Sequence, residues 1–135
     1  NVRLLLDFRI HPGMDHEQVG QFLDKGFEQA GIDGFQRTLH FYMPGGEIPQ
    51  DDRFVKLCLE ERERQFGIKS DPQPFDASCE QCFLAKEGIQ TVICGPGDIA
   101  QAHTVGEFTW EKQVRDAVSL YERIIDRVLY KTNYI

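Results

Sequence analysis

The sequence predicts an α/β fold in two parts, and three observations carry that prediction. Within residues 1–43, two apolar segments flank a helical pattern, which predicts strand–helix–strand, half of a ferredoxin-like split unit. Further along, a continuous apolar run between helical patterns is typical of a strand covered on both faces. The stretch Pro44–Pro49 is rich in proline and glycine. It predicts a boundary between two domains, at 1–44 and 45–135.

The first part begins with a predicted strand over Val2–Ile10, where branched and apolar residues precede a His-Pro-Gly turn. A helix is expected after Asp15, a favourable N-cap residue with Gln18 three positions on. Its apolar stripe recurs at helical spacing until Gly31. Gln36–Met43 then alternates between apolar and polar side chains, as a strand with one buried face does.

The second part begins with a charged helix over Asp51–Phe66, followed by a short helix over Asp76–Lys86. Ile89–Cys94 is the continuous apolar run that predicts a buried strand. A long loop, Gly95–Thr109, leads into a final helix that starts near Trp110 and carries one apolar stripe. The second part is therefore helix, helix, strand, loop, helix.

Composition and charge exclude several classes of protein. Fifteen Lys and Arg residues against 22 Asp and Glu residues give a net charge of −7, which repels a nucleic-acid backbone. Apolar runs fall far short of the roughly 20 residues that a membrane helix needs. The four cysteines are too few and too unevenly spaced for a disulfide framework, so we expect a cytoplasmic protein. The chain opens on Asn1 inside an apolar segment, and we expect it to be a piece of a longer protein.

Two charged or ligand-bearing motifs are expected to have no catalytic role. Glu60, Glu61 and Glu63 alternate with arginines on the charged helix and are predicted to face solvent. Cys79 and Cys82 form a CxxC pair, but they lack the second pair of ligands that a zinc site needs and the preceding strand of a redox motif.

The loop after the predicted buried strand is the sharpest candidate for chemistry. In α/β sheets ligands collect at the carboxyl ends of strands, and Gly95 and Gly97 let a backbone lie close to a ligand. His103 in this loop could bind a metal or act as a base, and Glu107 follows four residues later. The alternative, a surface loop with an ordinary histidine, stays open on these residues alone.

A family resemblance bears on that choice. The stretch Val92–Phe108 resembles the C-terminal signature of the acetylornithine deacetylase / succinyl-diaminopimelate desuccinylase family of zinc amidohydrolases, which are related to carboxypeptidase G2 and aminoacylase. Asp7-Phe8-Arg9 with the following Pro-Gly turn resembles a strand and turn in that family's lid domain, and Phe75–Ser78 resembles an acidic turn ahead of the metal site. The resemblance implies that 1–44 is the second half of a lid and dimerisation domain. It implies that 45–135 is the C-terminal part of an α/β catalytic domain.

The resemblance also implies roles for single residues. His103 matches the family's last metal ligand, Arg9 matches a lid arginine that grips the substrate carboxylate, and Gly95 and Gly97 shape the loop against substrate. Asp98 and Glu107 are implied as loop or outer-shell residues around the ligand, and Glu107 could also meet a substrate amine. For Arg9 the alternative is a solvated residue that pairs with Asp7 on the same strand face.

The family's remaining ligands and its catalytic glutamate have no match in this chain. The resemblance implies two Zn²⁺ ions in the intact enzyme, with other divalent metals such as Co²⁺ as alternatives. A single imidazole does not hold zinc, so the chain alone is expected to be inactive.

Two hypotheses of different classes follow. In the first, the chain is the C-terminal piece of a homodimeric metal-dependent amidohydrolase that cleaves the amide of an N-acyl amino acid or small peptide. In the second, it is a non-catalytic module whose open edges bind a second copy or a partner. The sequence upstream of Asn1 would distinguish them, because only the first requires the remaining metal-binding motifs there.

Overall fold

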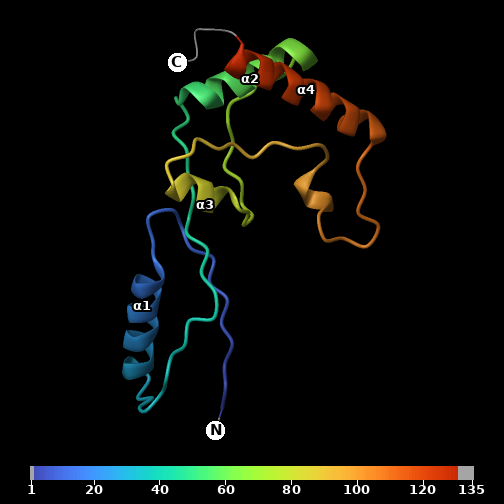
Figure 1. Cartoon of the computed structure of the whole chain (residues 1–135). Coiled ribbons are helices and arrows are strands. Elements are labelled where there is room, and N and C mark those ends of the chain that lie inside the picture. Colours follow the sequence, from blue (N-terminus) through green and yellow to red (C-terminus); the bar gives the residue numbers. More distant parts are fainter. Residues whose placement is uncertain (1, 131–135) are drawn as a thin grey trace. The chain divides into compact units, whose positions relative to one another are not determined.

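A computed structural model describes residues 2–130 of the chain. Four α-helices follow one another in this part of the sequence: α1 (His16–Gln29), α2 (Arg53–Phe66), α3 (Gln81–Lys86) and α4 (Glu111–Leu129) (Figure 1). A single turn of 3-10 helix, η1 (Ile99–Gln101), lies between α3 and α4.

The α/β prediction is wrong, because residues 2–130 contain helices and no β-strand. The predicted strands Val2–Ile10, Gln36–Met43 and Ile89–Cys94 are irregular chain in the structure. The first two run side by side in Figure 1, with Arg3 Nη2 3.5 Å from His40 Nε2, but they form no ladder. An alternating pattern predicts which face of a strand is apolar, whereas a strand exists only where its backbone pairs with a neighbour. These expectations of half a ferredoxin-like unit and of an α/β catalytic portion are therefore not met.

The chain divides into two compact units. The first contains the residues up to Glu47 together with Ala77–Gln90, and the second contains Ile48–Asp76 together with the chain from Thr91 onward. The domain boundary predicted at 44/45 from the Pro44–Pro49 stretch stays a prediction.

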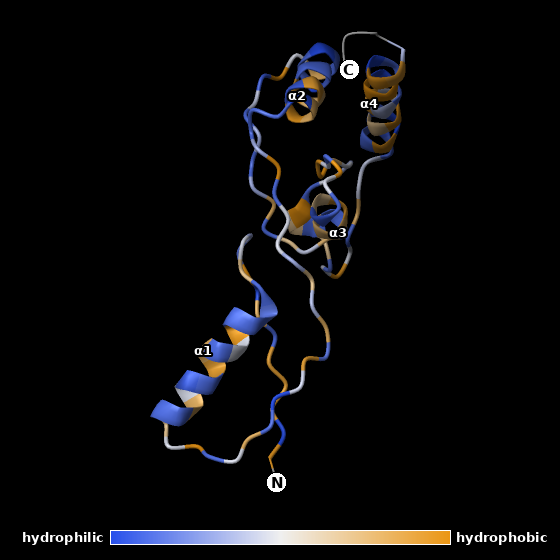
Figure 2. Ribbon diagram, turned by 60° about the vertical axis from the view of Figure 1, so that its left-hand side comes forward, coloured by the Kyte–Doolittle hydropathy of each residue, from blue (hydrophilic) through white to orange (hydrophobic). Residues whose placement is uncertain are grey.

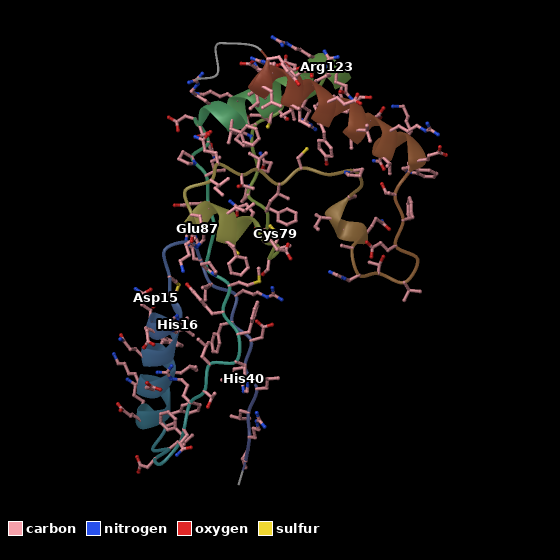
Figure 3. All side chains as sticks on the ribbon, viewed as in Figure 1. Asp15, His16, His40, Cys79, Glu87 and Arg123 are labelled. Atoms are coloured by element: carbon pink, nitrogen blue, oxygen red, sulfur yellow. The ribbon has the colours of Figure 1, made fainter. Side chains whose placement is uncertain are left out.

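Helix α1 of the first unit forms as its sequence predicts. The Asp15 side chain accepts a hydrogen bond from the Gln18 backbone at 2.8 Å, and the Gln18 side chain accepts one from the Asp15 backbone at 3.0 Å. Figure 3 shows Asp15 and His16 at the start of the helix. Arg37 binds both carboxylate oxygens of Asp24 at 3.1 Å, and a side chain at Gly20 would collide with that guanidinium. This contact holds the segment after α1 against the helix.

Helices α2 and α4 of the second unit pack against each other. Their buried apolar side chains are Val55 and Leu57 on α2 and Ala117 and Leu120 on α4. Gly67 ends α2 in the left-handed conformation (φ 68°), which glycine adopts without the steric cost that other residues meet. Figure 2 shows that apolar residues also lie along chain segments outside the helices.

Candidate functional site

The predicted site loop is an exposed stretch of irregular chain around η1 in the second unit. Asp98 begins η1, because its Oδ1 accepts a hydrogen bond from the Ala100 backbone N–H at 2.9 Å. Gly97 has φ 98°, and a Cβ built there would lie 3.2 Å from Thr109 Oγ1. The dihedral angle favours glycine at this position, and the Thr109 side chain would have to shift slightly to admit a larger residue. Gly95 has open space around it and a φ that other residues adopt, so nothing in this geometry requires glycine there.

His103 and Glu107 are brought together in this loop. The backbone N–H of His103 donates to Glu107 Oε2 at 2.9 Å. His103 has φ 62° and is the one residue other than glycine with a positive φ among residues 2–130. Its side chain lies at an exposed position, open to a partner from outside the loop.

Arg9 lies in the first unit, whereas His103 lies in the second. The Arg9 Nη1 donates to Ser78 Oγ at 2.8 Å, and Nη2 lies 3.8 Å from Asp7 Oδ2. The Arg9 and Asp7 side chains are 76% and 80% exposed, so their ion pair contributes little to stability. The Arg9 role as a carboxylate-binding residue stays a prediction, as do the roles predicted for the loop residues.

No set of metal ligands is assembled in the described part of the chain. Residues 2–130 contain no group of three or more His, Cys, Asp and Glu side chains placed to hold a metal ion. A protein zinc site uses three or four such ligands. His103 with its loop neighbours therefore falls short of a complete site. No helix within residues 2–130 is sufficiently long and apolar to cross a membrane.

A cavity of about 340 Å³ lies in the described part of the first unit. Tyr42, Glu47 and Lys86 are among its lining residues, and none of the predicted site residues lines it.

The cysteines are free thiols. Burial raises the pKa of the Cys58 thiol to about 11, with a smaller contribution from nearby Cys94. Burial also raises the pKa of Cys94, whose backbone carbonyl accepts a 2.7 Å hydrogen bond from the Tyr121 hydroxyl. A raised thiol pKa disfavours the reactive thiolate, so this pair lacks the electrostatic character of a nucleophile. Cys79 precedes α3 and Cys82 is buried in it, and Figure 3 marks Cys79 beside that helix.

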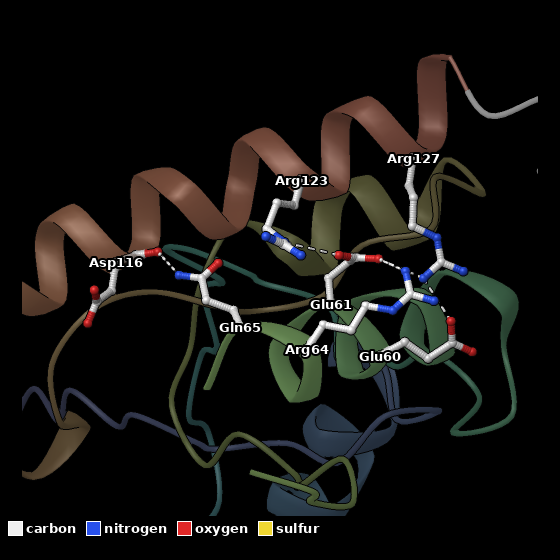
Figure 4. A network of polar contacts seen from close by, with 7 residues as sticks. All are labelled: Glu60, Glu61, Arg64, Gln65, Asp116, Arg123 and Arg127. Atoms are coloured by element: carbon white, nitrogen blue, oxygen red, sulfur yellow. Dashed lines mark hydrogen bonds and ion pairs between the residues drawn. The ribbon is translucent and has the colours of Figure 1, made fainter. Parts of the chain in front are cut away.

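The best-connected polar cluster was not expected from the sequence. Glu61, predicted to face solvent, is 3% exposed and lies between α2 and α4 (Figure 4). Its Oε1 accepts hydrogen bonds from Arg64 at 2.7 Å and Arg127 at 2.8 Å, and its Oε2 accepts one from Arg123 at 3.3 Å. Burial alone would raise the pKa of Glu61, but the arginine hydrogen bonds and charges outweigh it and lower the pKa. Arg123 and Arg127 are four residues apart and therefore share one face of their helix. This spacing was the one sequence feature that indicated a site for a buried carboxylate.

Comparison with known proteins confirms the resemblance. Over 138 aligned residues the chain is 25% identical to acetylornithine deacetylase from Photorhabdus laumondii subsp. laumondii, covering 96% of this chain and 33% of that protein. It is 26% identical over 126 residues to acetylornithine deacetylase from Pectobacterium carotovorum subsp. carotovorum, covering 90% of this chain and 31% of that protein. The chain thus spans about a third of the length of the curated relatives it matches. No solved structure matches it.

The family assignment rests on most of the chain. A sequence model of the peptidase family M20/M25/M40 matches residues 9–127, a range that begins at Arg9 and includes the loop with His103 and Glu107. The chain therefore belongs to peptidase family M20/M25/M40.

Proposed function

We propose that this chain is the C-terminal portion of a metal-dependent amidohydrolase that cleaves the amide bond of an N-acyl amino acid or a small peptide. The observation that carries the proposal is the family match over residues 9–127. The similarity to two acetylornithine deacetylases supports an N-acyl amino acid as substrate. The relatives are about three times as long as this chain, so the remaining parts of the hydrolase are proposed to come from further sequence. We also propose that the whole hydrolase is a homodimer, as the family resemblance implies.

The family is typically zinc-dependent, but the residues of this chain do not fit a zinc ion by themselves. Three or four ligands are needed, and residues 2–130 assemble no group of three. We propose that His103 contributes one ligand to a bound Zn²⁺ or Co²⁺ ion. The other ligands of this ion would come from other parts of the whole hydrolase.

Arg9 is proposed to bind the substrate carboxylate. A planar guanidinium suits two parallel hydrogen bonds to a carboxylate, which a lysine cannot make. Arg9 is exposed, and its Nη1 hydrogen bond to Ser78 at 2.8 Å occupies only one of its five donors. Its Nη2 lies 3.8 Å from Asp7 Oδ2, beyond hydrogen-bond distance, so the guanidinium can still bind a carboxylate from solvent.

The proposal is tested in the whole hydrolase with matched substrates. We expect hydrolysis of an N-acetyl amino acid, and a 30- to 1000-fold lower kcat/KM in Arg9→Ala, because a lost charge-assisted contact costs about 2–4 kcal/mol. For an amide analogue that lacks the carboxylate, Arg9→Ala should have nearly the same kcat/KM as the wild type. The control is Arg3→Ala, since Arg3 lies on the same exposed segment and is expected to leave kcat/KM unchanged.

Two outcomes would contradict this proposal in different ways. An absence of hydrolysis with every N-acyl amino acid and peptide tested would remove the amidohydrolase assignment. An equal loss with both substrates in Arg9→Ala would show that Arg9 supports the local chain and that the carboxylate contact is wrong.

A second candidate function is a module that binds a second copy through exposed apolar side chains. Leu5 and Phe41 on the two neighbouring irregular segments of the first unit are 81% and 73% exposed. Exposed apolar surface of this kind favours association.

A further inference from the structure

The backbone of His103 is held in an unusual conformation. A positive φ is uncommon for residues other than glycine, and it persists only where the surrounding structure holds it. Within residues 2–130, His103 is the one such residue, with φ 62°. The loop must therefore contain a group that favours this backbone geometry over the ordinary one.

Glu107 supplies that group. Its Oε2 accepts the His103 backbone N–H at 2.9 Å, and a hydrogen bond from an amide to a carboxylate is stronger than one between neutral groups. Because the carboxylate comes from four residues further along, the bond closes the chain between the two residues into a small ring.

The ring is itself fixed by hydrogen bonds of the intervening chain. The Thr104 hydroxyl donates to the Gln101 carbonyl at 2.7 Å, and the Glu107 N–H donates to the Thr104 carbonyl at 3.2 Å. The second bond fixes the backbone of Glu107 relative to the turn. The Glu107 side chain therefore begins at a position from which its carboxylate reaches the His103 amide.

The bond engages the backbone of His103 and leaves its imidazole available. In the described part of the chain no hydrogen bond or ion pair involves the His103 ring. The backbone sets the direction of the Cα–Cβ bond and limits the rotamers of the ring, so a group that holds this backbone narrows the directions in which the imidazole can point.

We propose that Glu107 is a positioning residue for His103, which acts by holding the left-handed backbone at His103 and does not itself contact substrate. The proposal rests on the proposed function only for its consequence, that the imidazole is presented to a metal. The resemblance left two roles open for Glu107, to order the loop or to contact a substrate amine. The proposed role is the first of these.

The first experiment measures amide hydrogen exchange of His103 in the full chain. Glu107→Ala removes the acceptor and should speed exchange of this amide by about tenfold or more. Glu107→Gln keeps a carbonyl oxygen at the same reach and should restore most of the protection. Glu111→Gln is the matched control, because this nearby exposed glutamate pairs with Arg115 and should leave His103 unchanged.

A second measurement separates this proposal from the function. In the whole hydrolase loaded with Zn²⁺, chelator competition should show 10- to 100-fold weaker binding at one site in Glu107→Ala, with partial recovery in Glu107→Gln. The KM for an amine-bearing substrate such as Nα-acetylornithine should change little in Glu107→Gln.

The outcomes are distinguishable. Unchanged exchange of the His103 amide in Glu107→Ala overturns the proposal, and so does a raised KM confined to amine-bearing substrates in Glu107→Gln. Faster exchange without any change in metal affinity supports the backbone role of Glu107 and contradicts the metal-ligand role of His103. If Glu107→Ala loses its helical circular dichroism, the exchange measurement uses Glu107→Asp instead. The shorter Asp side chain should also lose the hydrogen bond to the His103 N–H.

Discussion

At the scale of single residues, some residues predicted at the site shape the local chain, whereas others are exposed and make few contacts. Gly97 and Asp98 shape the site loop through a positive φ and a cap on η1. Arg9 and His103 make few contacts within their own units and are exposed. Such exposure is compatible with the proposed roles of Arg9 and His103, which remain proposals.

Glu61 is the polar residue whose loss is expected to destabilise the contact between α2 and α4. Glu61→Ala removes the acceptor shared by Arg64, Arg123 and Arg127 and should lower the free energy of unfolding by about 1–3 kcal/mol. Urea denaturation measures the change. Glu63→Ala, an exposed neighbour on α2, is the control and should stay within about 0.5 kcal/mol of wild type. Equal effects of the two substitutions would show that the Glu61 network contributes nothing specific.

The same network predicts a pH dependence. The pKa of Glu61 is lowered in the folded chain from its ordinary 4.5, so its contribution is complete above that value. The contribution is lost as the pH falls through the lower folded pKa, because the protonated carboxyl no longer attracts the arginines. The stability difference between wild type and Glu61→Gln should therefore shrink on acidification below about pH 4. A difference that stays constant from pH 7 to about pH 2 would contradict the assigned pKa direction.

At the scale of elements, local signals predicted the helices and failed for the strands. Asp15 and Gln18 predicted the start of α1, and Gly67 marks the end of α2, because caps act within one turn of chain. Val2–Ile10 and Gln36–Met43 have strand-like sequences, but pairing depends on a distant neighbour that a pattern does not contain. The prediction that Glu61 faces solvent was wrong for a similar reason, since its burial depends on arginines more than 60 residues further along the chain.

The cap of α1 gives a test at this scale. Asp15→Ala leaves the Gln18 N–H without its acceptor and should destabilise α1 by about 1 kcal/mol. Hydrogen exchange of the α1 amides should become faster by about fivefold, and Asp15→Asn should restore most of the protection. Unchanged exchange in Asp15→Ala would mean that packing by Arg37 and Asp24 holds this helix without its cap.

At the scale of the whole molecule, the family assignment and the site geometry lead to the same expectation. The chain belongs to an M20-type hydrolase family, yet it spans about a third of the length of its relatives and assembles no metal-ligand group within residues 2–130. His103 could be singled out from sequence as a candidate ligand because the loop signature is local. The further ligands that the family resemblance implies could not, since no residues of this chain match them.

Exposed apolar side chains predict self-association of the chain on its own. Leu5 and Phe41 lie on neighbouring segments and are largely exposed, so a second copy gains by covering them. Light scattering should show a mass above 15.6 kDa that falls in the double variant Leu5→Lys and Phe41→Lys. Gln21→Lys, which replaces an exposed polar residue on α1, is the control and should leave the mass unchanged because it removes no apolar surface. A strict monomer at high concentration would contradict this expectation.

The most direct test of the central claim, that this chain supplies one ligand to a metal site completed elsewhere, is a zinc titration of the 135-residue chain against a chelator. Residues 2–130 assemble no group of three ligands, and residues 1 and 131–135 include no His, Cys, Asp or Glu. The account predicts no stoichiometric zinc at sub-micromolar free concentration, because one imidazole does not form a site. Stoichiometric sub-micromolar zinc that is lost in His103→Ala would contradict it, since the chain would then hold a complete metal site of its own.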